Sequence, residues 1–536
     1  MGSRRPGPAR TRAGTGHEEA GAALLLVLFF SIAIAGFVLA LYEFAGSRMR
    51  LAASRLERLE ALAVAEGTTE GARRAALDAL AQHAPVPTSG TVWVRDVQGA
   101  YTIEALGSGV TVDETSATAG VQTTVYPYRI RGTATVGRTT VAVTRIVHLR
   151  ATPAFQFAAY YDGDLELHPS ASMTWRGFMR ASGDVYVGSS AGGATIAVDA
   201  ELFQGQRLFR CRKTDPATLP STLRFRNRAT GTLVTAPAGL TSASPTWRLD
   251  AESLWAGSVE TATHGVRSSV AARRRTLDAF DGTGARGYYH ARAGLVVRDK
   301  KVFDANGNDI TSLLLPDTVK ERSFFDGREE ENIKVTDIDL TLLRLSLRWP
   351  ANGLLYAYRT DASPTKPYGI RLRNGASNLQ PLTVVSEDPV FVLGDFNTGS
   401  TQPVAIMADA VSVLSNAWND SKANKTLPAA SNTSCRFAVL TGDVPSNPAT
   451  GEYSGGLENL VRLHESWTGR TLTLRGSFVR GFASEISRAP WASGGDNYDP
   501  PNRDYDFYQP FAGASAPLPP FTPMVHIFED VEWTAQ

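Results

Sequence analysis

This sequence contains almost no cysteine and carries almost no net charge, and each of these two features excludes some classes of protein. Only Cys211 and Cys435 occur in 536 residues, so a disulfide scaffold, a cysteine zinc site and an iron–sulfur cluster lack their ligands. Lysine plus arginine (54) nearly cancels aspartate plus glutamate (53), for a net charge of +1. That balance removes the long-range field with which nucleic-acid binders attract phosphate, so we expect no nucleic-acid partner.

The two cysteines allow two interpretations. In an extracytoplasmic compartment, a single disulfide between Cys211 and Cys435 is possible. The alternative, which we place slightly ahead, is two separately buried thiols.

Residues capable of chemistry do not gather into a recognisable pattern. The eight histidines show no metal-ligand spacing, and no G-x-x-x-x-G-K loop for phosphate is present. Gly188–Gly192 matches the G-x-S-x-G string around a nucleophilic serine, but no helix pattern follows it, which favours a loop. The oxygen-bearing residues from Asp304 to Asp309 lack EF-hand spacing and predict a hairpin turn. We therefore predict no catalytic residue, no metal ligand, no cofactor and no enzymatic activity.

A long uncharged segment lies near the N-terminus. From Ala20 to Tyr42 no charged residue appears in 23 positions. As a helix, this segment reaches about 35 Å, more than the roughly 30 Å apolar thickness of a bilayer. It is also longer than the apolar stretch of a cleaved secretory signal, about 7 to 15 residues. We predict a membrane-spanning helix, whose orientation stays open because arginines flank it equally on both sides.

The helical pattern continues past the apolar segment. Glu43 to Glu66 contains no proline and is rich in strong helix formers. Apolar residues fall within an arc of about 140° on this helix and predict a partner surface. They are Leu51, Leu56, Leu59, Leu62 and Ala63. Gly67, followed by Thr68 and Thr69, predicts a helix end and a new start, with a second short helix over Ala72–Ala81.

A basic leader, a glycine, an apolar helix and an amphipathic extension together resemble the N-terminal region of type IV pilin-like proteins, in particular PilX-type minor pilins. The resemblance covers roughly residues 14 to 85. It implies that a prepilin peptidase cuts after Gly21, so that Ala22 becomes the mature N-terminus. It also implies assembly with other pilin-like subunits through a helix that lies in membrane lipid beforehand. Leu26 occupies the fifth mature position, where major pilins carry glutamate, and this departure resembles a minor or tip subunit. The alternative is a plain single-pass anchor that no peptidase cuts.

From about Thr88 onward, short runs of β-branched and aromatic residues alternate with Gly, Asn, Asp and Pro. We predict an α+β, mainly β fold with a leader (1–21), a transmembrane helix and stalk (22–85), a small β unit (86–153) and a β-rich body (154–536). The closely spaced strands favour an irregular parallel β-solenoid over β-sandwich domains. Stretches such as Asp388–Asn397 resemble the long uncharacterised C-terminal regions of proteins with PilX-type N-termini.

Two functions follow as hypotheses. The first is a structural minor pilin or pseudopilin-like subunit of a type IV pilus or a type II secretion-like filament, displaying its β body for assembly or adhesion. It would sit in the inner membrane with its body in the periplasm or on a surface filament. The second is a membrane-anchored extracytoplasmic β-helix enzyme acting on carbohydrate, for which the sequence shows no catalytic cluster.

Overall fold

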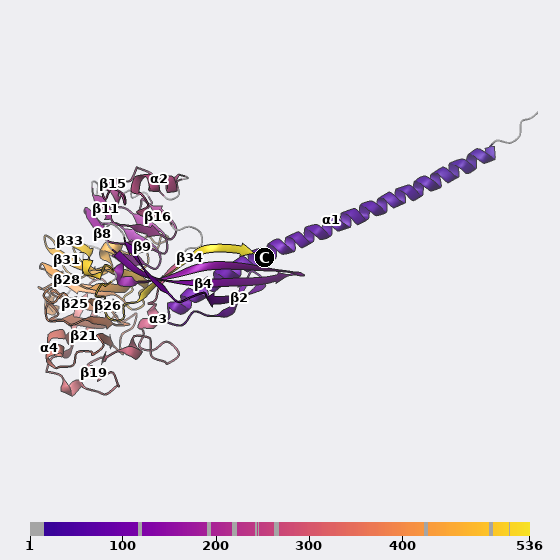
Figure 1. Cartoon of the computed structure of the whole chain (residues 1–536). Coiled ribbons are helices and arrows are strands. Elements are labelled where there is room, and N and C mark those ends of the chain that lie inside the picture. Colours follow the sequence, from indigo (N-terminus) through magenta and orange to yellow (C-terminus); the bar gives the residue numbers. More distant parts are fainter. Residues whose placement is uncertain are drawn as a thin grey trace, which may run out of the picture.

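The computed structural model describes residues 16–115, 120–189, 194–216, 222–241, 244, 246–261, 267–422, 427–492, 497–513 and 515–536. One long helix projects from a mainly β body, as Figure 1 shows. The mainly β fold class and the long N-terminal apolar helix are therefore confirmed. Most of the predicted leader, residues 1–15, lies outside the described residues.

Helix α1 (Gly16–Leu80) is continuous over 65 residues, which corresponds to a length of about 98 Å. Its most apolar 18-residue stretch has a mean hydropathy of 2.9, and none of that stretch is buried. The helix is long and apolar enough to cross a membrane. Its C-terminal part packs against the rest of the chain: Glu57 accepts a hydrogen bond from the hydroxyl of Thr139 (3.3 Å), and fully buried residues begin at Ala61. Shorter α-helices in the described part of the body are α2 (Trp247–Trp255), α3 (Arg274–Leu277) and α4 (Leu340–Leu345).

The helix break predicted at Gly67 is wrong. The hydroxyl groups of Thr68 and Thr69 donate backward to the carbonyls of Val64 (2.7 Å) and Glu66 (2.8 Å), within the same helix. Gly67 instead provides room, because a Cβ on this residue would lie 2.9 Å from Cγ2 of Val94. The glycine allows the helix to approach the sheet closely and does not end it.

A seven-stranded antiparallel sheet lies beside this part of α1. Its path is β1 (Ser89–Val94), β2 (Val97–Ala105), β4 (Gly120–Val136), β5 (Thr139–Pro153), β34 (Met524–Ala535) and β17 (Arg267–Val270), with β3 (Val110–Thr115) paired to β4. Strands β1 to β5 fit the predicted unit of residues 86–153. The C-terminal strand β34 pairs with β5, and β17 pairs with β34. The range predicted for the body, 154–536, therefore contains two strands that belong to this first sheet.

Small residues let α1 and the sheet pack closely. The buried face of the helix includes Ala61, Ala65, Thr68, Ala72 and Ala76. On the sheet side, a Cβ on Gly99 would overlap the hydroxyl of Thr68, and a Cβ on Gly132 would lie 2.6 Å from the carbonyl oxygen of Ala65. The two surfaces thus meet with backbone close to backbone, which fixes how the helix leaves the sheet.

After β5 the chain passes through three sheets in a repeating order of one strand each. We call one pass through the three sheets a circuit. The first circuit is β6 (Ala159–Tyr161), β7 (Leu165–Leu167) and β8 (Met173–Arg176), and the second is β9 (Met179–Ala181), β10 (Val185–Val187) and β11 (Thr195–Asp199). The third is β12 (Leu202–Gln204), β13 (Leu208–Phe209) and β14 (Thr222–Arg226). Strand β15 (Leu233–Thr235) pairs antiparallel with β14, and β16 (Val259–Thr261) follows β12 in its sheet. Corresponding strands of neighbouring circuits pair in parallel.

The recurring Gly-Asp turns lie on top of one another between these circuits. The backbone N–H of Asp184 donates to Oδ1 of Asp164 (2.8 Å), and that of Gly183 donates to the carbonyl of Gly163 (2.9 Å). The carboxylate of Asp184 in turn accepts from the N–H of Arg207 on the next circuit (2.9 Å). Each aspartate therefore satisfies a backbone donor of the following circuit, which explains why the motif recurs.

A second run of strands begins at the other end of the 11-stranded sheet and returns toward the first run. In that sheet it contributes β18 (Leu295–Arg298), β19 (Lys301–Asp304), β22 (Leu354–Tyr358), β24 (Leu382–Val385), β26 (Val404–Ala408), β29 (Ala438–Asp443) and β32 (Phe478–Ala483). A six-stranded sheet contains β20 (Val319–Asp326), β21 (Glu331–Asp339), β23 (Gly369–Arg373), β25 (Val390–Leu393), β27 (Val411–Leu414) and β30 (Val461–Leu463). A three-stranded sheet contains β28 (Thr433–Arg436), β31 (Thr471–Gly476) and β33 (Asn502–Phe507).

The two runs meet where the stalk joins the body. Strand β32 pairs in parallel with β6, so the end of the second run lies directly against the start of the first. The chain enters the body after β5 and leaves it into β34, both strands of the antiparallel sheet. In Figure 1, α2 and β19 accordingly lie at opposite ends of the body, with the stalk between them.

The body's sheets are open, and three of them mix strand directions. Parallel pairs predominate, but β14·β15, β18·β19 and β20·β21 are antiparallel. Because the sheets are mixed and not closed, the predicted parallel β-solenoid is not shown. One hydrophobic core runs through both halves of the body, from Phe155 to Ile527.

Candidate assembly surface and buried polar sites

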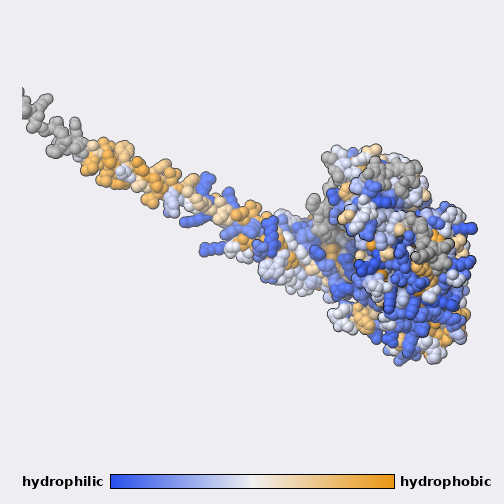
Figure 2. Space-filling model, turned by 180° about the vertical axis from the view of Figure 1, so that it is seen from behind, coloured by the Kyte–Doolittle hydropathy of each residue, from blue (hydrophilic) through white to orange (hydrophobic). Residues whose placement is uncertain are grey.

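The N-terminal part of α1 is an exposed apolar rod, which we define as residues 21–42. Figure 2 shows hydrophobic residues gathered along its outer half. Leu24 is 73% exposed and Phe29 is 69% exposed, although both are strongly apolar. Isolated apolar residues are common on protein surfaces, but a continuous apolar surface of this kind requires lipid or protein neighbours. The rod is therefore the main candidate for a functional surface.

The predicted processing site lies at the start of this rod. Gly21 and Ala22 are exposed within α1, and a Cβ built on Gly21 meets nothing within 4 Å. Leu26, at the predicted fifth mature position, is 55% exposed. Cleavage between Gly21 and Ala22 remains a prediction.

The apolar stripe of the stalk keeps most of its surface open. Leu51, Leu56 and Leu59 are 50%, 66% and 64% exposed, and only Leu62 among the stripe's leucines is half-buried. The partner surface predicted for this stripe is therefore not supplied by the described part of this chain.

A buried ionic cluster fastens α1 to strands β5 and β34 of the sheet. Arg73 is fully buried, and its guanidinium donates to Oε1 of Glu70 (2.9 Å) and to the carbonyl of Phe528 (3.2 Å), and lies 3.4 Å from Asp530. Arg145 of β5 donates to the same Asp530 carboxylate (3.0 Å). The sequence pattern gave no sign of this cluster, because its members lie more than 450 positions apart (Asp530 to Arg73 spans 457).

We expect Arg73→Met to lower the free energy of unfolding by about 2 kcal/mol, because Glu70, Asp530 and a buried carbonyl lose a charged donor. Arg74→Met is the matched control, since the side chain of Arg74 is 87% exposed and its nearest carboxylate is 4.0 Å away. Thermal unfolding of the two variants in the same detergent measures the difference. Equal stability would show that the cluster is not needed to hold the helix.

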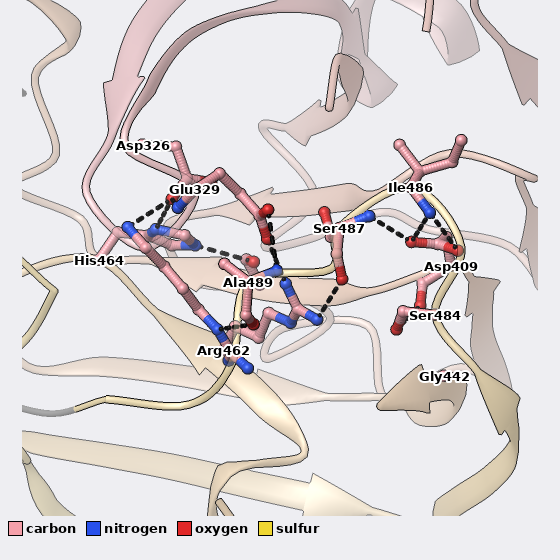
Figure 3. A network of polar contacts seen from close by, with 12 residues as sticks. Asp326, Glu329, Asp409, Gly442, Arg462, His464, Ser484, Ile486, Ser487 and Ala489 are labelled. Carbon is pink, nitrogen blue, oxygen red and sulfur yellow. Dashed lines mark hydrogen bonds and ion pairs between the residues drawn. The ribbon is translucent and has the colours of Figure 1, made fainter. Parts of the chain in front are cut away.

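The body contains a second polar network on the outer face of the six-stranded sheet (Figure 3). The tip of the β20–β21 hairpin brings Oδ1 of Asp326 to 3.3 Å from Nδ1 of His464, whose Nε2 lies 2.9 Å from the hydroxyl of Ser412. Burial alone would raise the pKa of Asp326, but the charge and hydrogen bond of His464 outweigh it and hold the pKa at about 2. The three residues follow the order of a serine hydrolase triad.

The three side chains are closed off from solvent, which distinguishes this arrangement from a catalytic site. Ser412, His464 and Asp326 are 2%, 4% and 3% exposed, and Ser412 lies in the middle of strand β27. A nucleophile must reach a substrate carbonyl, and this hydroxyl is enclosed by protein. We interpret the three residues as a structural network that attaches the hairpin tip to the sheet.

Glu329, between β20 and β21, is partly buried in the same network, whereas Glu330 and Glu331 are exposed. Glu329 accepts from the guanidinium of Arg462 (2.9 Å), with only 8% of its own side chain exposed. Next to it, Asp409 accepts backbone N–H groups from residues 485 to 487 at 2.6–3.2 Å. These carboxylates fasten the segment after β32 onto the body (Figure 3).

The remaining sequence candidates lie apart from one another. Ser190 of the G-x-S-x-G string falls outside the described residues. Cys211 is a half-buried free thiol and Cys435 a buried one in β28, where burial raises its thiol pKa. Asp304 accepts from the N–H groups of Asn306 and Asn308 (both 2.9 Å), forming a hairpin turn at the predicted place. Within the described ranges, no three His, Cys, Asp or Glu side chains group as metal ligands.

Comparison with known proteins gives only weak structural similarity. No family model matches the sequence, and no curated protein matches it. Among solved structures, the chain is similar to the competence-associated pilin ComZ from Thermus thermophilus, at 10% sequence identity and a TM-score of 0.27. That similarity covers 90% of this chain and 98% of the other.

Proposed function

We propose that the protein is a pilin-like subunit that is anchored in a membrane by α1 and that assembles with related subunits through the same helix. The observation that carries this proposal is the exposed apolar rod of residues 21–42 on a rigidly held stalk. Lipid tails cover such a surface before assembly, and apolar helices of neighbouring subunits cover it afterwards. The same surface is thus buried in both states.

The way the stalk is held supports a structural role. The close glycine contacts and the Arg73 cluster fix the helix to the antiparallel sheet, so a load on the helix passes directly to β4, β5 and β34. The body is joined at both of its chain ends to that sheet. We infer that the body is a solenoid-like stack displayed by the helix as a minor pilin or pseudopilin displays its head.

The proposal assigns binding partners and a cellular location to the protein. A prepilin peptidase would remove residues 1–21, and pilin-like subunits would pack on the apolar rod and on the stripe of Leu51, Leu56 and Leu59. The body would lie in the periplasm or on a surface filament. A PilX-type identity, an adhesive role and the lack of enzymatic activity belong to this proposal. Its principal alternative is a helix that anchors the body permanently and is never cut.

Gly21→Trp tests the proposal. A peptidase that cuts after a small residue cannot accommodate the bulky tryptophan side chain at that position. In the native host, we expect the variant to keep its leader and to disappear from sheared surface filaments, while its total amount in membranes stays similar. Gly46→Ala is the control, since this glycine is also in the exposed helix and a Cβ there meets nothing within 4 Å. Recovery of uncleaved Gly21→Trp protein in filaments at the wild-type level would overturn the assignment.

A further inference from the structure

A cavity of about 330 Å³ lies beside the β18–β19 hairpin, in the part of the body where Figure 1 labels β19. It lies between the loop after α3, the short helical turn His290–Arg292, the β18–β19 hairpin and the end of β22. Its volume is in the range of about 300 to 1,000 Å³ that small-molecule sites occupy. None of the residues that line it belongs to the assembly surface or to the networks of the stalk and the hairpin tip.

Aromatic rings form the walls of the cavity. His290 packs with ring centroids 5.6 Å from Tyr358 and 5.9 Å from Phe280. Phe303 of β19 also lines the cavity. Phe280 is 52% exposed although it is a large apolar residue, so its ring is available to a ligand. Such faces pack well against a flat ring that has an apolar surface of C–H groups.

Two arginines give the mouth of the cavity a positive charge. Arg286 is held at the mouth by its backbone bridge to Phe280, and Arg298 lies 4.7 Å above the ring of Phe303. In the described part of the chain, neither guanidinium forms an ion pair with a carboxylate. The acidic lining residue, Asp304, uses its carboxylate for its own turn. The mouth can therefore receive an anionic group through charged, two-pronged hydrogen bonds.

The floor of the cavity offers a hydrogen-bond acceptor. His290 is only 7% exposed, and its Nδ1 donates to the carbonyl of Ala279 at 2.7 Å. Burial and the two nearby arginines lower the pKa of His290, so the ring is neutral at physiological pH. A neutral ring with a proton on Nδ1 carries a lone pair on Nε2. This nitrogen accepts a hydrogen bond from a ligand hydroxyl.

We propose that this cavity binds an acidic sugar unit, with a uronic acid ring as the simplest member of the class. The aromatic walls pack against the C–H face of the ring, Arg286 and Arg298 hold its carboxylate, and Nε2 of His290 accepts a ring hydroxyl proton. A neutral sugar lacks the group that the arginines recognise. A nucleotide also supplies a charge, a flat ring and ribose hydroxyls, so adenosine monophosphate is the competing ligand in the test. The inference concerns binding alone and does not depend on filament assembly.

Titration of the detergent-solubilised full-length chain with digalacturonate and with digalactose tests the proposal. We expect saturable binding of digalacturonate and at least tenfold weaker binding of digalactose, because a charge-assisted hydrogen bond is worth about 1.5 to 3 kcal/mol. The double variant Arg286→Ala/Arg298→Ala should lose at least about tenfold in affinity for the acidic sugar and remove the preference over the neutral one.

Arg292→Ala is the matched control, since Arg292 lies on the same helical turn but stacks on Tyr288, outside the cavity. It should bind like the wild type, and equal thermal unfolding of all variants shows that each is folded. His290→Phe should weaken both sugars by a similar factor, because it removes the acceptor and leaves the charge. The proposal is overturned if digalacturonate fails to bind below about 10 mM, if both sugars bind equally, or if only adenosine monophosphate binds. None of these outcomes bears on cleavage after Gly21 or on filament assembly.

Discussion

Gly132→Ala is expected to separate α1 from the sheet and to lower the local free energy of unfolding by about 3 kcal/mol, the upper end for overpacking. The added Cβ would lie 2.6 Å from the carbonyl oxygen of Ala65 and 3.2 Å from the backbone nitrogen of Thr69. Both are backbone atoms of a helix that is fixed along its buried face, so neither can rotate away. Hydrogen exchange of the amides in β4 and β5, read by mass spectrometry, measures the loss as a fall in protection of about two orders of magnitude.

Gly107→Ala provides the contrast in the same part of the chain. A Cβ at Gly107 would lie 3.7 Å from Cγ of Pro127, an ordinary contact. Because alanine reduces the freedom of the unfolded chain, this variant should be neutral or more stable by about 0.4 to 1 kcal/mol. Equal effects of the two substitutions would show that close packing of helix on sheet does not determine stability here.

Ile32→Arg should release the protein from membranes. Ile32 is near the centre of the uncharged segment and is 65% exposed, so the body cannot shield a charge placed there. A charge at the centre of a spanning helix costs about 2.5 to 3.5 kcal/mol on insertion scales, a reduction of roughly 100-fold in the inserted fraction. The fraction of protein that sediments with membranes after a carbonate wash measures this effect.

Leu56→Arg is the control for that experiment. Leu56 is equally exposed, at 66%, but lies 14 residues beyond Tyr42 (56 − 42), about 21 Å farther along the helix. Its membrane association should therefore stay at the wild-type level. If Ile32→Arg also stays with the membrane, the apolar rod is not what holds the protein there.

The sequence predicted local elements well where a short pattern determines them. Among the short apolar runs that follow Thr88, four form one strand each: Leu354–Tyr358, Leu382–Val385, Val390–Leu393 and Val411–Leu414. Each is a run of β-branched or aromatic residues between turn formers, buried on both faces as in a parallel sheet. The uncharged segment likewise predicted the exposed helix, because hydropathy over 23 residues needs no knowledge of the fold.

Elements that depend on distant partners were missed. Gly67 has the sequence of a helix end, and only its contact with Val94 explains why the helix continues. Strand β34 joins a sheet built from residues more than 370 positions earlier, as its pairing of Met524 with Pro153 shows (524 − 153 = 371). The predicted strand Leu472–Phe478 is in fact the end of β31 and the start of β32, which belong to different sheets. A local sequence pattern contains no information about such long-range contacts.

The polar sites show the same limit. Nothing near Asp326 in the sequence points to His464, and the cavity combines Arg286 and His290 from one segment with Tyr358 from another. The useful signal lay in composition, since Phe280 and the arginines around it interrupt an otherwise glycine-rich loop. These residues form a site only when the fold brings Tyr358 and Phe303 to the same place.

The mass of the mature N-terminal peptide, from protein isolated out of its native membranes, tests the central claim most directly. If the exposed rod is a pilin-type helix, the peptide begins at Ala22 and no copy retains residues 1–21. A chain that still carries its leader in every membrane and filament fraction would contradict the account, because an uncut helix is only an anchor.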